Sequence, residues 1–121
     1  MAEGTPIRIR IGDAFLDGRL WDNPTAQDLI AQLPLTLEFR DLNGLEKIAR
    51  LPRELTMDGV PEGDDPEPQD IGFYAPSGDL VFYYDDVGYY DGIVRLGVFA
   101  SDMNVIRNQT GNFTATVELA T

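Results

Sequence analysis

Short runs in which apolar and polar residues alternate are the feature that most constrains the fold of this chain. In the first run, residues 7–11, isoleucines alternate with arginines. Successive side chains of a β-strand face opposite ways, so such a run predicts a half-buried strand with its arginines in solvent. Glycine, proline, asparagine and aspartate separate the runs, as is typical of tight turns. The clearly alternating runs are residues 7–11, 35–40 and 113–119, and further runs with strand character, set between turn signals, span residues 14–21, 45–51, 71–75, 80–84 and 93–99.

Short strands spaced this closely favour one architecture. A parallel α/β sheet would need strands that alternate regularly with helices, and this chain lacks that pattern. We therefore predict a mainly β fold, an eight-stranded, mostly antiparallel closed barrel. The run at 45–51 mixes helix and strand cues, and we prefer a strand there.

One segment has a clear helical period, and it predicts a short amphipathic helix over about residues 24–33. Asn23 can cap this helix, while Thr25 with Asp28 is an alternative capping pair. A second short helix is expected over about residues 102–107. The apolar stripe of the first helix consists of Ala26, Leu29, Ile30 and Leu33.

The length and composition limit the classes of protein that this chain can belong to. A chain of 121 residues is expected to fold as one domain, residues 1–121, with residues 1–5 flexible. The sequence has no cysteine and no histidine, which excludes disulfides, thiolate nucleophiles, cysteine-based zinc sites and Ser–His–Asp catalysis. No apolar run approaches the roughly 18 residues of a transmembrane helix, and the first residues lack the pattern of a secretory signal. We expect a cytoplasmic protein that does not bind membranes.

The charge is strongly acidic and unevenly distributed. A net charge of −12 excludes the basic surface that DNA or RNA binding requires. Most of this charge comes from residues 54–94, which contain eleven acidic residues and no basic one. The simplest interpretation is a solvated surface around a proline-rich loop at 52–70. The alternative is a surface that binds a cation or a basic partner.

The acidic residues form no recognisable metal site or catalytic pair. Asp85, Asp86 and Asp91 do not have the spacing of a calcium-binding EF-hand loop. No glycine pattern indicates a nucleotide phosphate, so we predict no metal, no cofactor and no catalytic residue. Lys47, the only lysine, is expected to be a surface charge, with a reactive amine as the alternative.

Aromatic residues gather between residues 73 and 90. Alternation along the run at 80–84 sends Phe82 and Tyr84 to one face and Tyr83 to the other. Packing in the core and at the barrel rim is one interpretation, with partners for the buried hydroxyl groups. The other is a groove, because flat apolar rings with polar tips suit recognition of a peptide or a small ligand. The cluster consists of Phe73, Tyr74, Phe82, Tyr83, Tyr84, Tyr89 and Tyr90.

Several stretches, in this order and spacing, resemble the small bacterial cyclophilin-like domains, which have no assigned function. The resemblance covers about residues 7–119. It implies an eight-stranded, mostly antiparallel barrel with a helix closing one end. The stretches that carry it are residues 20–26, 33–37, 43–48, 70–76, 82–84 and 96–97.

The resemblance does not imply prolyl isomerase activity. True cyclophilins carry a catalytic arginine, a Phe-Met-x-Gln-x-Gly-Asp stretch, and then a tryptophan and a histidine in their groove. This chain has no histidine and no Phe-Met pair, and its only tryptophan, Trp21, precedes the first helix. No catalytic residue therefore transfers, although Arg50 lies in a region where an arginine could line a groove.

We predict a binding or accessory module rather than an enzyme. Its partner would be an extended peptide or a small molecule, recognised by aromatic faces and oriented by Arg50 or by acidic residues. One alternative is a weak or unconventional peptidyl-prolyl isomerase, and another is a structural or oligomeric protein without a ligand. The sequence does not determine the oligomeric state. The predicted groove is lined by Arg50, Tyr74, Tyr84, Asp85, Tyr89 and Tyr90.

Overall fold

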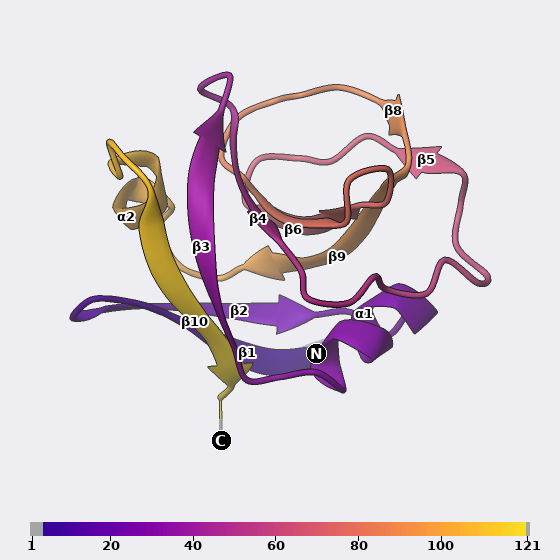
Figure 1. Ribbon diagram of the computed structural model, residues 1–121, viewed down its shortest axis with the longest axis horizontal. Helices are drawn as coiled ribbons and strands as arrows, with labels where there is room; N and C mark the ends of the chain where they lie inside the picture. The colour runs from indigo at the N-terminus through magenta and orange to yellow at the C-terminus, as the bar shows by residue number, and fades with distance from the viewer. Residues whose placement is uncertain (1–3, 121) are drawn as a thin grey trace.

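The computed structural model describes residues 4–120 and shows the predicted fold class, a closed antiparallel barrel (Figure 1). The strand order around the barrel is β1-β10-β3-β4-β7-β6-β9-β2, and β2 pairs with β1 to close it. All eight strands match runs that were predicted as strands from the sequence. Their bounds are β1 Thr5–Ile11, β2 Ala14–Leu20, β3 Leu35–Leu42, β4 Glu46–Arg50, β6 Asp70–Tyr74, β7 Asp79–Tyr83, β9 Ile93–Phe99 and β10 Phe113–Leu119.

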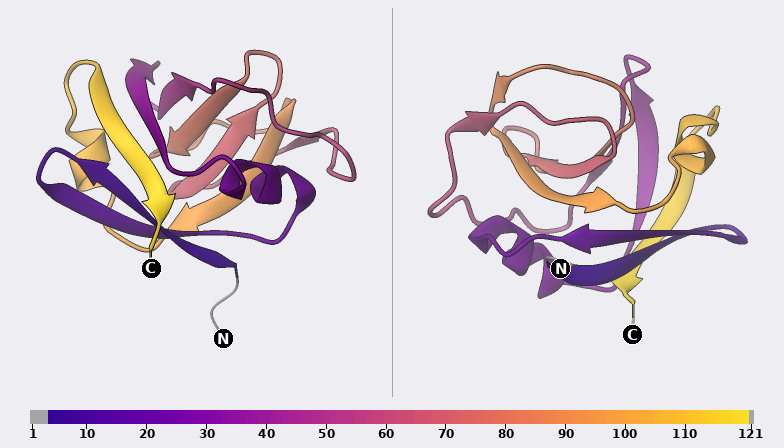
Figure 2. Two further views of the ribbon diagram at one scale, coloured as in Figure 1. Left: turned by 60° about the horizontal axis from the view of Figure 1, so that its bottom comes forward. Right: turned by 180° about the vertical axis from the view of Figure 1, so that it is seen from behind.

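Two short helices lie on opposite sides of the barrel, as both views of Figure 2 show. The helix α1, Pro24–Ile30, is shorter than predicted, because after Ile30 the backbone tightens into three-residue turns ahead of Pro34. The side chain of Asn23 caps α1 as expected, accepting a hydrogen bond of 2.8 Å from the Ala26 amide. The second helix, α2, spans Asn104–Arg107, within the predicted range.

Two elements of the structure were not predicted. The strands β5, Gly63–Asp64, and β8, Tyr90–Asp91, pair outside the barrel wall as a two-stranded ribbon. Thr5, which was expected in a flexible start, is the first residue of β1. The rest of that expectation concerns residue 4, a bend, and residues 1–3, which lie outside the described residues.

Aromatic rings fill the centre of the barrel. Phe39 on β3 stacks on Phe82 of β7 with ring centroids 4.5 Å apart, and on Phe113 of β10 at 5.5 Å. Phe99 on β9 meets the edge of Phe82 at 5.0 Å. Because these rings come from four strands, their offset and edge contacts tie the barrel wall together across its interior.

A second, smaller apolar cluster lies on the outer face of the barrel. It consists of Ile48, Val81, Tyr83 and Ile93, against which Leu42, Tyr74 and Val87 pack. Phe82 and Tyr84 belong to the interior core, whereas Tyr83 belongs to this outer cluster. The predicted split of these three rings between two faces is confirmed. One part of the wall is therefore apolar on both sides.

Lys47 is buried, so the expectation of a surface charge is wrong. Its side chain is 2% exposed and its Nζ lies 3.1 Å from a carboxylate oxygen of Asp41. The same Nζ donates a hydrogen bond of 2.8 Å to the Gln109 carbonyl and lies 5.4 Å from the centre of the Tyr84 ring. A carboxylate, a carbonyl and an aromatic face together satisfy the charge, which is the condition for burying an ammonium group.

The acidic segment is not uniformly solvated. Asp70 is buried and accepts a hydrogen bond of 2.7 Å from Nε of Arg95, the first basic residue after the segment. Asp79 is also buried and accepts a hydrogen bond from the Ser77 hydroxyl. Within residues 4–120, no helix has the length and apolar character needed to span a membrane.

Candidate functional site

Cross-strand pairing sets the geometry of the outer face formed by β3, β4, β7 and β6. Arg50 lies opposite Asp79, and Asp79 lies opposite Tyr74 on the next strand. One step along, Arg40 lies opposite Ile48, which in turn lies opposite Val81. Residues in directly opposite positions are within about 5.5 Å of each other. A charged row and an apolar row therefore run side by side across these strands.

The pairing of β3 with β4 is incomplete, which opens the barrel wall. Their ladder runs from Leu42 opposite Glu46 to Arg40 opposite Ile48 and stops there. Beyond that point β3 pairs only with β10, and β4 pairs only with β7. Figure 1 shows β3 and β4 diverging from their common hairpin.

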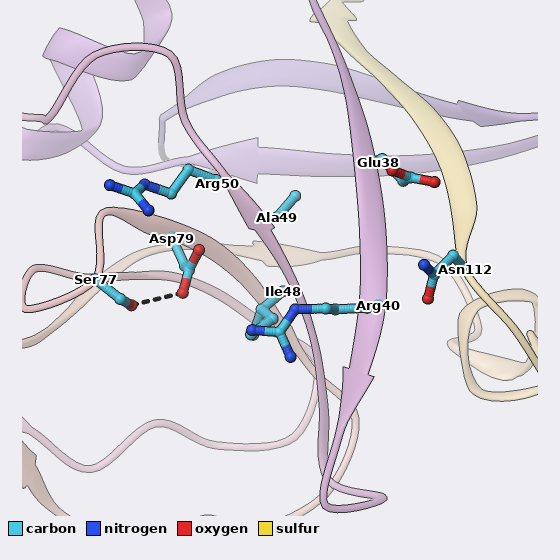
Figure 3. A pocket seen from close by; sticks show the side chains of 8 residues that line it. All are labelled: Glu38, Arg40, Ile48, Ala49, Arg50, Ser77, Asp79 and Asn112. Atoms are coloured by element: carbon cyan, nitrogen blue, oxygen red, sulfur yellow. Dashed lines mark hydrogen bonds between the residues drawn. The ribbon is translucent and has the colours of Figure 1, made fainter.

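A cavity of about 360 Å³ lies at this opening (Figure 3), and we call it the arginine cavity. Arg40 extends across toward Ile48, while Arg50 extends the other way toward the turn that joins β6 to β7. The Ser77 hydroxyl holds Asp79 between them through a hydrogen bond of 2.5 Å. The lining residues are Glu38, Arg40, Ile48, Ala49, Arg50, Ser77, Asp79 and Asn112.

The two arginines of this cavity have free guanidinium groups. Among residues 4–120, every ion pair uses a cation other than Arg40 and Arg50. Both side chains are exposed, and neither forms an ion pair with Glu38 or Asp79, the two acidic residues that line the same cavity. Their donors are available to a carboxylate or a carbonyl oxygen, the acceptors that a planar guanidinium fits best.

A second cavity of about 250 Å³ lies farther along the same outer face, and we call it the tyrosine cavity. It lies between the β3–β4 hairpin and the segment 84–92, which begins beside that hairpin and runs to β8 (Figure 1). Tyr83 reaches across β6 above Gly72, where a Cβ atom would stand only 2.6 Å from the Tyr83 ring. The lining residues are Leu42, Asn43, Leu45, Glu46, Tyr74, Tyr83, Val87, Tyr90 and Ile93.

The ionisable groups of the tyrosine cavity are perturbed by burial. Removal from water raises the pKa of Glu46, and the nearby carboxylates of Asp79 and Asp41 raise it further. Burial also raises the pKa of the Tyr83 hydroxyl far above its usual range, with Glu46 as the next contributor. Both groups would gain from a positive charge nearby, because each is disfavoured in its anionic form.

A third cavity, of about 370 Å³, lies beside α2 and is separate from the outer face. Tyr84 and Arg107 line it, and Arg107 donates a hydrogen bond of 2.7 Å to the Tyr84 carbonyl. The Tyr84 hydroxyl donates to the Asp41 carboxylate, and burial together with that carboxylate raises the pKa of Tyr84 to about 12. Asp41 in turn has a lowered pKa, chiefly because of this hydrogen bond.

The structure brings three of the six predicted groove residues to one face. Arg50 lines the arginine cavity, and Tyr74 and Tyr90 line the tyrosine cavity. Tyr84 is buried in the core and reaches the α2 cavity instead. Asp85 and Tyr89 are exposed on the segment 84–92 and line none of these three cavities.

Four residues that shape the two outer cavities are absent from the predicted groove, although one of them, Tyr83, belongs to the predicted aromatic cluster. They are Arg40, Glu46, Asp79 and Tyr83. Arg40, Glu46 and Tyr83 lie within runs that were predicted as strands, whereas Asp79 precedes the run predicted at 80–84 and is the first residue of β7. For Asp79 a sequence signal was available. The turn at residues 75–78 sets Tyr74 opposite Asp79, so the two residues share one face of the hairpin.

Comparison with known families identifies the fold. A family model described as "Cyclophilin-like family" matches residues 9–118, nearly the whole chain. The chain belongs to the cyclophilin-like family. A solved structure similar to this cyclophilin-like protein is that of the hypothetical protein AF2241 from Archaeoglobus fulgidus. It is 14% identical, with a TM-score of 0.75, and the match covers 99% of this chain and 98% of that one.

The relatives of this cyclophilin-like protein carry no activity over to it. A search of curated proteins finds no match, and at 14% identity the archaeal structure supports the fold alone. The residues described for this cyclophilin-like barrel contain no cluster of three or more acidic side chains placed to hold a metal ion. The function must therefore be argued from the cavities of its outer face.

Proposed function

We propose that this cyclophilin-like protein is a binding module that takes an extended peptide or a small ligand on its outer face. The observation that carries the proposal is the adjacency of the arginine cavity and the tyrosine cavity. Both open along the same face, and Ile48 lines the first and packs with Tyr83 of the second. A ligand lying along β4 would therefore contact polar donors at one end and aromatic rings at the other.

The two cavities offer complementary chemistry. Arg40 and Arg50 supply unpaired guanidinium groups, which would bind a carboxylate or the carbonyl groups of a peptide backbone. Tyr74 and Tyr90 supply ring surface with polar tips, which binds apolar groups with little loss of conformational entropy. Where β3 and β4 separate, the backbone of β4 near Ala49 is also available to a ligand. Ala49 lines the arginine cavity although its side chain is buried.

A weak prolyl isomerase is the second candidate. The observation in its favour is a free arginine, Arg50, beside the apolar surface of Ile48, since a guanidinium can bind the carbonyl of a peptide bond that is being rotated. Against it, the chain has no histidine, and its only tryptophan, Trp21, lies beside Arg95 rather than on this face.

The proposal can be tested by screening a library of short peptides and small carboxylates by ¹H–¹⁵N NMR. We expect perturbed amide resonances along β4 and β7, and binding at least tenfold weaker for Arg50→Ala. The matched control is Arg19→Ala, since Arg19 also forms no ion pair among residues 4–120 but lies on β2, which pairs with neither β4 nor β7.

A proline-isomerisation assay with the same variants separates the two candidates. Acceleration of isomerisation that Arg50→Ala abolishes would favour the enzyme over the binding module. Absence of any ligand on the outer face would overturn both, and would favour a structural protein.

A further inference from the structure

We propose that the tyrosine cavity recognises an organic ammonium group. The inference rests on the proposed function and names the chemistry that one end of the outer face selects. The group is an alkylated or quaternary ammonium, carried by a free small molecule or by the side chain of a peptide. The arginine cavity, by contrast, would contact the anionic or carbonyl part of the same ligand.

Aromatic walls are the first observation. Tyr74, Tyr83 and Tyr90 line the cavity from β6, β7 and β8, so rings approach it from three separate elements. The face of a tyrosine ring attracts a cation within about 6 Å, and several rings around one site are the usual receptor for a quaternary ammonium. The volume of about 250 Å³ is below the range of roughly 300–1,000 Å³ for drug-sized ligands. A compact head group therefore fits it better than a large molecule.

The sign of the charge is the second observation. Glu46 is the only ionisable acid or base among the lining residues other than the tyrosines, and no arginine or lysine lines the cavity. The segment 84–92 beside it adds Asp85, Asp86 and Asp91 and no basic residue. An anion would meet repulsion from all four carboxylates, whereas a cation would be attracted toward them.

An unpartnered hydroxyl is the third observation. The Tyr83 side chain is 1% exposed, yet its hydroxyl forms no hydrogen bond with another residue of the described part of the chain. Within residues 4–120 no fully enclosed polar side-chain atom lacks a partner, so this hydroxyl retains access to open space. A cation that reaches this oxygen would be attracted by its partial negative charge, as well as by the negative charge of the Glu46 carboxylate.

These observations distinguish the tyrosine cavity from the other cavities of the molecule. The arginine cavity contains two guanidinium groups, and the α2 cavity is lined by Arg107. In both cavities carboxylates accompany these basic groups, Glu38 and Asp79 in the first and Asp102 in the second, whereas no basic residue lines the tyrosine cavity. Only the tyrosine cavity therefore combines aromatic rings with an acidic group and no competing cation.

The test is a comparison of choline with 3,3-dimethyl-1-butanol, in which carbon replaces the charged nitrogen at nearly equal shape. Binding is followed by ¹H–¹⁵N NMR on the full chain. We expect choline to perturb amides of residues 83–93 and to bind at least tenfold more tightly than the neutral analogue. Equal binding of the two compounds, or no binding of choline, would overturn the proposal.

Two substitutions with a matched control locate the site. Tyr90 and Tyr89 are each 57% exposed, but only Tyr90 lines the cavity. We expect Tyr90→Ala to weaken choline binding about three- to tenfold, Glu46→Gln to weaken it similarly, and Tyr89→Ala to leave it unchanged. A loss for Tyr89→Ala equal to that for Tyr90→Ala would overturn the assignment to this cavity.

A further arm identifies the source of the ammonium group and separates this inference from the proposed function. A short peptide with a trimethyllysine is compared with the same peptide carrying leucine, a neutral apolar residue, at that position. Preference for the methylated peptide over free choline assigns the group to a side chain, and the reverse assigns it to a free small molecule. Peptide binding that Arg50→Ala weakens but choline does not displace would refute the ammonium site while leaving the binding module intact.

Discussion

Removing Lys47 and neutralising its partner Asp41 are expected to weaken the fold by different amounts. Lys47 is 2% exposed, whereas the Asp41 side chain is 41% exposed. In Asp41→Asn the ammonium stays charged inside the barrel end, with the Gln109 carbonyl as its remaining strong acceptor. In Lys47→Met the ammonium is gone, and the carboxylate that remains can still be hydrated.

The magnitudes follow from this asymmetry. Removing one partner of a buried ion pair costs about 3–5 kcal/mol when the other charge stays buried. We expect about 3 kcal/mol for Asp41→Asn, because one amide oxygen and the Gln109 carbonyl still accept from Nζ. After Lys47→Met, Asp41 keeps hydrogen bonds from the Gly44 amide and the Tyr84 hydroxyl. A half-exposed carboxylate contributes little to stability through an ion pair, so we expect a loss of about 1 kcal/mol.

Equilibrium unfolding in urea measures both values. With a denaturant dependence of about 2 kcal/mol per molar, the two midpoints should differ by about 1 M. The double substitution should be no less stable than Asp41→Asn alone, because it removes the stranded charge, and a double-mutant cycle reports the coupling. A loss for Lys47→Met that equals or exceeds the loss for Asp41→Asn would refute the reasoning.

Three further predictions test the outer face and α1. Burial raises the pKa of Glu46, so the ionised form of this residue weakens the fold above that pKa. In urea unfolding, Glu46→Gln should be more stable than wild type at pH 7. The difference in unfolding free energy should disappear below about pH 4.3, where Glu46 is protonated in both the folded and the unfolded state. Gly72→Ala should lower the free energy of unfolding by about 1–3 kcal/mol, because the added Cβ would lie 2.6 Å from the Tyr83 ring. Thermal unfolding measures this loss. Gly111→Ala is the control, because a Cβ at Gly111 meets no neighbour within 4 Å. The hydrogen bonds from Arg53 and the Thr56 amide lower the pKa of Asp28; this stabilisation is present above about pH 3.9 and is lost as the pH falls through the lowered pKa. Asp28→Asn should therefore lower the free energy of unfolding by about 1 kcal/mol at pH 7. In urea titrations at strongly acidic pH, the variant and the wild type should have the same free energy of unfolding.

Alternation, β-branched and aromatic residues and turn residues together predicted the barrel strands, because each of these signals lies within the strand or directly beside it in the sequence. The ribbon of β5 and β8 has no such signal. Each strand is two residues long, and the two pair only because the barrel brings residues 63–64 next to residues 90–91. Such pairing is a property of the tertiary structure rather than of either segment.

The failures at the candidate site have a common physical cause. Alternation shows that Glu46 and Lys47 face opposite ways, but it does not say which of them faces the core. Where a wall is apolar on both sides, as at Ile48 and Ala49, hydrophobicity does not decide the matter. Tyr84 is the opposite case: it is in phase with Phe82, a core residue, so its placement inside the barrel was available from the sequence.

The position of β10 in the barrel has a consequence for synthesis on the ribosome. This last strand lies between β1 and β3 and pairs with both. Until residues 113–119 emerge, the nascent chain exposes two unpaired strand edges, which are templates for association with other chains. The pairing of β10 with β1 also joins two strands that lie far apart in the sequence, and such non-local pairing slows folding. A nascent or truncated chain that lacks only this strand is therefore expected to associate through these two edges.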